Sequence, residues 1–196
     1  MRDTGRAITT TPAAGAAMPR TLIACVGYRN LRDLSAGNAV VDALLPLPWP
    51  EGVEVEDLSY GPMDAIFRLR EAGFARLFIV GTVGQPSARP GRILWRPWRY
   101  EPEAPATIQA RVAEAVTGVI SLENLLVICA HFAALPPDVT VIEIEPGDDS
   151  WGDEFSQPVA RAIAAVVADL IAACGGPETA AWHARLAAAA SDSAPG

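Results

Sequence analysis

Short strand-like apolar runs alternate along this chain with longer segments in which apolar residues recur every three or four positions. The short runs predict strands at 21–26, 53–58, 77–83, 91–99 and 139–145. The longer segments predict helices at 39–45, 63–72, 107–116, 122–135 and 156–173. Spacings of three and four residues place apolar side chains on one face of a helix. Alternation of this kind predicts βαβ units built around a parallel sheet.

The run 91–99 departs from this alternation, because it follows a turn containing glycine and proline and has no crossover helix before it. We therefore expect it to lie antiparallel at an edge of the sheet. The run 139–145 alternates less strictly than a half-exposed strand would, which suits a strand covered on both faces. The predicted fold is a three-layer α/β sandwich, with a mostly parallel twisted sheet of about five strands, one antiparallel edge strand and helices on both faces.

The composition indicates one domain and two terminal segments. The chain has 196 residues, of which 51% are hydrophobic, enough for a substantial single core. Residues 1–19 are rich in Ala, Thr, Gly and Pro and contain no apolar run of a secretory signal or membrane anchor. We expect a disordered leader at 1–19, the α/β domain at 20–176, and a C-terminal helix with a tail at 177–196.

Charge and cysteine content restrict the partners and the compartment. The formal net charge is −8, so a field that would gather nucleic acid or anionic lipid is absent. Cys25, Cys129 and Cys174 lie in apolar contexts without a Cys-x-x-Cys spacing. We expect buried thiols, a cytoplasmic protein, and a protein partner rather than nucleic acid or a membrane.

Candidate site residues follow the predicted strands, because ligands of open α/β sheets bind at the carboxyl ends of the strands. The residues that we expect around a cleft there are Gly27, Tyr28, Asp33, Gly37, Asp57 and Thr82. Asp33, Asp57 and Glu123 are the carboxylates available for acid and base chemistry, which needs two such groups within reach of a substrate. Their alternative role is that of solvated loop acids.

The order and spacing of these residues resemble those of the nickel-iron hydrogenase maturation endopeptidases, which trim the C-terminus of the hydrogenase large subunit after its metal centre is installed. Gly27, Asp33 and Gly37 match the second glycine, the first acid and the last glycine of the first-loop pattern of that family. The other matches are Asp57 at the end of the second strand, Pro90-Gly91 in the edge hairpin and Ile144-Glu145-Pro146 after the last strand. The resemblance runs from about residue 21 to residue 174 and implies the family's α/β fold.

The family's metal ligands are absent from the matching positions. The family holds its metal with an acid in the first loop, an aspartate at the end of the third strand and a histidine that opens the helix before the last strand. Those positions are Leu34, Gly81 and Glu123 in this chain, and the side chains of leucine and glycine offer no metal ligand. We therefore expect no metal, no cofactor and no catalytic residue. One-residue shifts that bring Asp33 and Thr82 toward the site are the alternative.

The leading hypothesis is a pseudoprotease that acts as a binding or assembly factor. By the resemblance, its partner is a nickel-iron hydrogenase large subunit or another maturation factor. One alternative is a divergent endopeptidase that still trims a hydrogenase precursor. The other is a small-molecule-binding module that reuses the cleft, which Tyr28 and Leu34 make more apolar.

Two further features, the edge-strand aromatics and an acidic run, invite a functional interpretation. Trp95, Trp98 and Tyr100 interleave with arginines on the edge strand, a composition typical of protein interfaces, although an amphipathic strand explains it equally well. The acidic run 148–154 offers oxygen ligands for a hard cation, but carboxylates before a helix N-terminus are also favoured by the helix dipole.

The two histidines offer no catalytic pair. Cys129 and His131 are two residues apart on a predicted helix and therefore point to different sides. His183, beside Trp182, suits a docking contact of the predicted C-terminal helix.

Overall fold

A five-stranded sheet forms the centre of the computed structural model, which describes residues 19–84, 86, 88–115 and 120–176. The strands are β1 (Thr21–Cys25), β2 (Val53–Asp57), β3 (Arg76–Thr82), β4 (Ile93–Pro97) and β5 (Asp138–Ile144). Their order is β2-β1-β3-β5-β4. All neighbours are parallel except β4, which pairs antiparallel with β5 at the edge. The predicted sheet and its antiparallel edge strand are confirmed.

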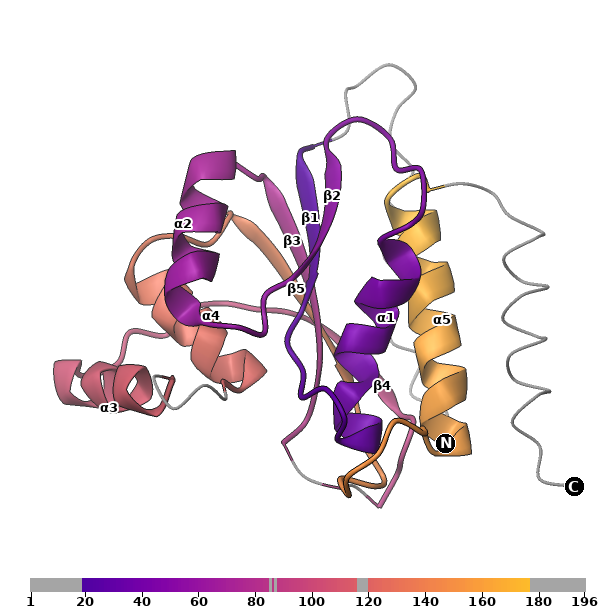
Figure 1. Ribbon diagram of the computed structural model, residues 1–196. Helices are drawn as coiled ribbons and strands as arrows, with labels where there is room; N and C mark the ends of the chain where they lie inside the picture. The colour runs from indigo at the N-terminus through magenta and orange to yellow at the C-terminus, as the bar shows by residue number, and fades with distance from the viewer. Residues whose placement is uncertain (1–18, 85, 87, 116–119, 177–196) are drawn as a thin grey trace, which may run out of the picture.

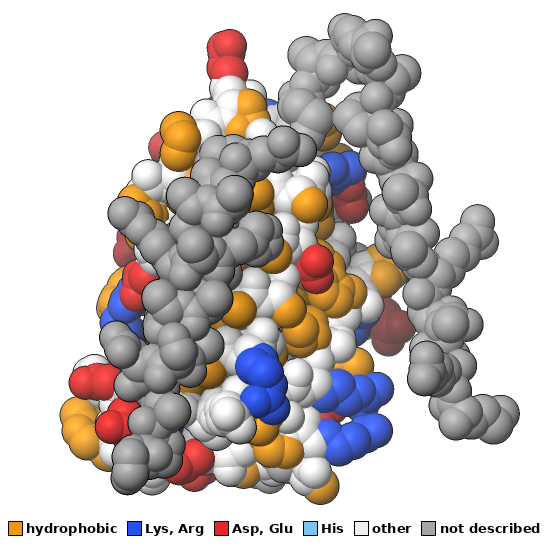
Figure 2. Space-filling model, turned by 90° about the vertical axis from the view of Figure 1, so that its right-hand side faces the viewer, with side chains coloured by type: hydrophobic (Ala, Val, Ile, Leu, Met, Phe, Trp, Pro, Cys, Tyr) orange, Lys and Arg blue, Asp and Glu red, His pale blue; other side chains and the backbone are white. Residues whose placement is uncertain are grey.

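Helices cover both faces of the sheet, as Figure 1 shows. One face carries α1 (Ala36–Leu44) and α5 (Gln157–Ala173), and the other carries α2 (Pro62–Ala72) and α4 (Leu122–His131). The remaining helix, α3 (Pro105–Ala115), lies against α4. The predicted three-layer sandwich is therefore confirmed. Figure 2 views the side of α1 and α5, where basic side chains gather toward the lower end.

The strand residues divide between two cores because successive side chains point to opposite faces. Leu22 and Ala24 of β1 pack toward α2 and α4, whereas Ile23 and Cys25 pack toward α1 and α5. Every residue of β1 is buried, which explains the unbroken apolar run in the sequence. The three cysteines are buried free thiols, as predicted. Among the described helices, none is both long and apolar enough to cross a bilayer.

Several element boundaries differ from the predicted ones, most of all those of α1, α4 and β4. A 3-10 turn, η1 (Arg32–Ser35), leads directly into α1, which begins three residues before the predicted start. The helix α4 ends at His131 because Ala133 adopts a φ of 53°, and the N–H groups of Ala133 and Ala134 donate back to Ala130 and Cys129 at 2.9 Å. That pattern closes a helix in a Schellman motif.

The edge strand β4 is shorter than predicted, since Gly91 has a φ of 78° and its N–H donates to the carbonyl of Glu145 at 2.8 Å. The predicted leader and the predicted helix at 177–190 lie outside the described residues.

The helix α1 approaches the sheet most closely at Gly37. A Cβ atom there would lie 2.9 Å from the carbonyl oxygen of Val80 and 3.1 Å from that of Val26. Both oxygens belong to the backbone at the carboxyl ends of β3 and β1, so they cannot move aside as a flexible side chain would. Glycine at this position therefore sets the distance between α1 and the loop edge of the sheet.

We predict that Gly37→Val lowers the free energy of unfolding by about 1–3 kcal/mol, because the added side chain has to push α1 away from the sheet. Urea denaturation followed by circular dichroism measures the effect. Ala39→Val, two residues along the same helix, is the control for the helix propensity of valine. An equal loss in both variants would contradict the close-approach argument.

Candidate functional site

A cavity of about 270 Å³ opens at the carboxyl edge of the sheet. The strand order reverses between β1 and β3, and open α/β sheets bind their ligands at such a switch point. The cavity lies there, between the loops that follow the two strands. Its lining residues are Val26, Tyr28, Thr82, Val83, Gly84, Ser121, Leu122, Glu123 and Glu143. The site is thus largely apolar, with three hydroxyl groups from Tyr28, Thr82 and Ser121 and two carboxylates from Glu123 and Glu143.

Two of the predicted cleft residues, Tyr28 and Thr82, line this cavity, and Glu123 lines it as well. Burial and the charge of Glu114 raise the pKa of Tyr28 above its ordinary value, so its hydroxyl stays protonated at neutral pH. The other predicted cleft residues, Gly27, Asp33, Gly37 and Asp57, are not among the lining residues.

The three positions that the resemblance matches to the family's metal ligands do not form a ligand set. The side chain of Leu34 is buried. At Gly81, a Cβ atom would lie 3.0 Å from Cδ2 of Leu122 and 3.1 Å from the carbonyl oxygen of Val26. Within the part of the chain that the structure describes, no group of three or more His, Cys, Asp or Glu side chains is placed to hold a metal ion. The residues present therefore do not fit the family's metal.

Glu123, the third of these positions, belongs to a hydrogen-bond network with β4 and β5. Its carboxylate accepts from Nε1 of Trp98 at 3.2 Å and from Nη2 of Arg96 at 3.3 Å. Arg96 also donates from Nε to Glu143 at 3.1 Å. Burial alone would lower the pKa of Arg96, but the two carboxylates raise it above its ordinary value. The guanidinium is therefore a permanent cation beside the cavity.

Asp33 lies in a different network, which joins the loop after β1 to the loop after β5. Its side chain is completely buried. The carboxylate accepts from the backbone N–H groups of Gly147, Asp148 and Ser156 at 2.8, 3.0 and 2.8 Å, and from the hydroxyl of Ser156 at 2.8 Å. Its own N–H donates to the carbonyl of Asp148 at 3.1 Å. Asp33 thus binds backbone rather than facing the cavity.

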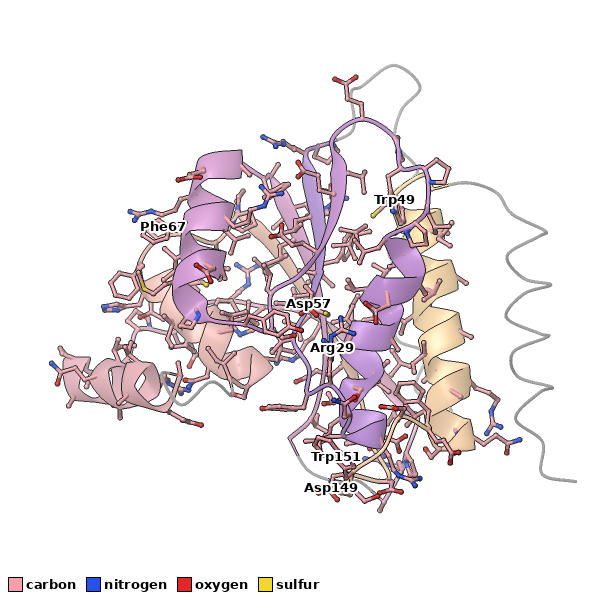
Figure 3. The ribbon with its side chains drawn as sticks, in the orientation of Figure 1. Arg29, Trp49, Asp57, Phe67, Asp149 and Trp151 are labelled. Atoms are coloured by element: carbon pink, nitrogen blue, oxygen red, sulfur yellow. The ribbon has the colours of Figure 1, made fainter. Side chains whose placement is uncertain are left out.

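Asp57, at the end of β2, forms the third network. It accepts from Arg29 at 2.9 Å, from Asn38 at 3.0 Å, and from the N–H and hydroxyl of Ser59, and Figure 3 shows Arg29 beside it. Burial would raise the pKa of Asp57, but these hydrogen bonds together hold it below its ordinary value.

The thiol of Cys25 lies against this network, in surroundings that disfavour the thiolate. Its Sγ contacts Nδ2 of Asn38 at 3.8 Å. Burial, and then the charge of Asp57, raise the pKa of Cys25 far above its ordinary value, whereas a reactive cysteine needs a lowered one. Asp33, Asp57 and Glu123 consequently each have their own partners, and the structure does not bring them together around one cleft.

The aromatic residues of the edge hairpin lie on different sides of β4. Trp98 is 9% exposed and stacks on Tyr100, with ring centroids 6.3 Å apart. Trp95 is 40% exposed and meets Phe78 edge-on at 6.4 Å on the opposite face. Two exposed tryptophans were the basis for expecting an interface here, and only Trp95 has that exposure. The interface stays a prediction that now rests on Trp95.

The remaining sequence candidates have local partners. His131 is exposed and Cys129 is buried, on different sides of α4 as predicted, and Nδ1 of His131 lies 3.3 Å from the hydroxyl of Tyr100. Asp148 of the acidic run accepts from the N–H and hydroxyl of Ser150, which lower its pKa. Trp151 projects from that loop and is 77% exposed. His183 lies outside the described residues.

Sequence reasoning missed Arg96, Glu143 and Ser121. Glu143 left a weak signal, since it is an acid between two buried isoleucines of a mostly apolar strand. Arg96 gave none, because its role depends on which strand lies beside β4.

No protein-family model matches the chain, and no curated protein matches it in sequence. Solved structures do match. A hydrogenase 2 maturation peptidase from a Thaumarchaeota archaeon is 26% identical, with a TM-score of 0.55, over 80% of this chain and 98% of that one. An endopeptidase from Escherichia coli is 21% identical, with a TM-score of 0.59, over 79% and 91%. The hydrogenase maturating endopeptidase HybD from E. coli is 20% identical, with a TM-score of 0.55, over 79% and 91%.

These likenesses confirm the resemblance that the motifs predicted, and they show that the chain has the fold of these maturation peptidases. They cover about four fifths of this chain. The loss of the metal ligands is not addressed by the likenesses and stays a prediction.

We predict that Asp33→Asn lowers the free energy of unfolding by about 2–4 kcal/mol, because the amide presents N–H groups to backbone N–H donors that then lose their acceptor. Asp149→Asn, an exposed change in the neighbouring loop, is the matched control and should have almost no effect. Urea denaturation of both variants measures the two free energies of unfolding. Equal stability of the two variants would show that the buried carboxylate does not hold the two loops together.

We also predict that Gly81→Asp destabilises the domain by about 1–3 kcal/mol, because its side chain has to displace Leu122. The double variant Gly81→Asp/Leu122→Ala should lose less than the sum of its two single changes. Gly84→Asp is the control, since nothing lies within 4 Å of a Cβ atom at Gly84. Additive losses in a thermal unfolding series would contradict the packing of Leu122 against Gly81.

Proposed function

We propose that this chain, which has the fold of the hydrogenase maturation peptidases, is a non-catalytic pseudoprotease that acts as a binding or assembly factor. The cavity between β1 and β3 is the part of the molecule best suited to receive a segment of a partner. It lies where the peptidase fold places its ligand loops, and it is large enough for one or two side chains. By the resemblance, the partner is a nickel-iron hydrogenase large subunit or another maturation factor.

The observation that carries this proposal is the packing around Gly81. The side chain of Leu122 occupies the space that an aspartate at position 81 would need. Leu34 is buried and has no ligand atom, and Glu123 is held by Trp98 and Arg96. Apolar packing thus stands in place of metal ligands at Leu34 and Gly81, and the guanidinium of Arg96 binds the carboxylate of Glu123. We further propose a cytoplasmic setting, because all three cysteines are free thiols.

A second candidate function, a small-molecule-binding module, is favoured by the lining of the same cavity. Val26, Val83 and Leu122 provide apolar contact, while Thr82 and Ser121 provide two hydroxyl groups. Ligand pockets typically combine an apolar lining with a few polar groups that orient the ligand. A divergent endopeptidase, in contrast, would need a new ligand set, and the described residues contain no group of three candidate side chains.

Metal content and precursor processing test the proposal. Purified protein incubated with Ni²⁺ or Zn²⁺ and then desalted should carry far less than one metal per chain by elemental analysis, and Glu123→Ala should be indistinguishable from it. Mixed with the unprocessed large subunit of a nickel-iron hydrogenase from the same source, the protein should co-purify with it and leave its mass unchanged. Stoichiometric metal that is lost in Glu123→Ala, or a shortened large subunit in mass spectrometry, would contradict the proposal.

The contribution of the cavity to partner binding is tested in the same assay. Thr82→Arg should fill the cavity and weaken co-purification, whereas Ser150→Arg on the exposed loop after β5 adds the same charge elsewhere. Equal loss in both variants would point to net charge instead of the cavity.

A further inference from the structure

A guanidinium lies between two carboxylates at the edge of the candidate cleft. Arg96 of β4 binds Glu143 of β5 through Nε at 3.1 Å and Glu123 of α4 through Nη2 at 3.3 Å. Both acids line the cavity at the carboxyl edge of the sheet. Their oxygens reach two nitrogens of one planar group, so the two carboxylates are close to each other.

The strand register relates Glu143 to the family's aspartate position. Gly81 of β3 is the register partner of Glu143 on β5, and register partners on neighbouring parallel strands point to the same face of a sheet. Glu143 therefore places a carboxylate on the neighbouring strand β5, beside Gly81, where the resemblance leads one to expect an aspartate. The cleft thus contains two acids and a cation.

Two carboxylates in this position need a positive charge. The side chain of Glu143 is only 17% exposed, and a carboxylate that is largely removed from water is costly unless it is paired. A second carboxylate nearby adds repulsion. Arg96 supplies the compensating charge, and the additional hydrogen bond from Trp98 to Glu123 fixes the orientation of one acid.

We propose that the guanidinium of Arg96 supplies, from within the chain, the positive charge that a metal ion supplies in the maturation endopeptidases, and that Glu123 and Glu143 bind a hard divalent cation once this guanidinium is removed. Carboxylate oxygens are the ligands that such cations prefer, and Ser121 and Thr82 add hydroxyl oxygens to the same lining. The inference rests on the proposed function in one respect, namely that the intact chain holds no metal at the family position.

Thermal unfolding with and without millimolar Mn²⁺ tests this inference. The melting temperature of the wild-type chain should not respond to Mn²⁺. Arg96→Gln should melt several degrees lower, and saturating Mn²⁺ should raise its melting temperature by roughly 3–6 °C, because a ligand that binds only the folded state stabilises it. The response should disappear in Arg96→Gln/Glu143→Gln, which leaves one carboxylate. Arg99→Gln, which removes a neighbouring guanidinium, is the matched control and should not respond.

Each outcome of the Mn²⁺ experiment either supports or overturns the inference. A folded Arg96→Gln variant that ignores Mn²⁺, or a response that persists without Glu143, would overturn the inference. If Arg96→Gln is insoluble, Arg96→Gln/Glu143→Gln should recover solubility because the repulsion is gone, and its failure to do so would also overturn the inference. Metal uptake by the wild-type chain would instead contradict the proposed function.

Discussion

The buried carboxylate of Asp33 is the interaction on which the arrangement of the loop edge depends. It accepts four hydrogen bonds, three of them from backbone N–H groups of a segment more than 110 residues further along the chain. A charged acceptor in such a position satisfies several donors at once, which no neutral side chain of similar size does. It thereby fixes the loop after β1, the loop after β5 and the start of α5 relative to one another. Asp33 is also one of the residues that carry the resemblance to the maturation endopeptidases, and the structure gives it a role in the frame.

The cavity is set by a different constraint, namely close packing at the switch point between β1 and β3. Gly37 brings α1 against the backbone ends of both strands, while Gly81 accepts the side chain of Leu122 from the opposite face. These contacts fix where the loops leave the sheet and how much space remains between them. Neither contact involves a ligand atom. The shape of the cleft therefore depends on packing contacts and not on the polar side chains that line it.

The sequence predicted the parts of this protein that depend on local pattern. Most strands and helices were recognised because they bury apolar side chains in a regular pattern, and β4 was placed at the edge because no helix precedes it. The turn at Arg32–Ser35 was missed, since its conformation depends on the bonds of Asp33 to residues 147–156. Tyr28 and Thr82 were found from their positions after strands, and Glu123 was found through the resemblance to the maturation endopeptidases. Arg96 and Glu143 were missed because their pairing follows from the strand order β5-β4, which no local pattern encodes.

The residues that hold the loops in place differ from the residues that line the cavity. The frame rests on a buried acid bonded to backbone and on glycines at close approaches, and any change there costs stability directly. The positions that the resemblance matches to metal ligands hold Leu34, Gly81 and Glu123. Leu34 is buried, Gly81 accepts the side chain of Leu122, and Glu123 binds Arg96. A carboxylate added at position 81 alone would lie beside Leu122 and would leave Arg96 bound to Glu143. A metal site at these positions would therefore require concerted changes on β3, β4 and α4.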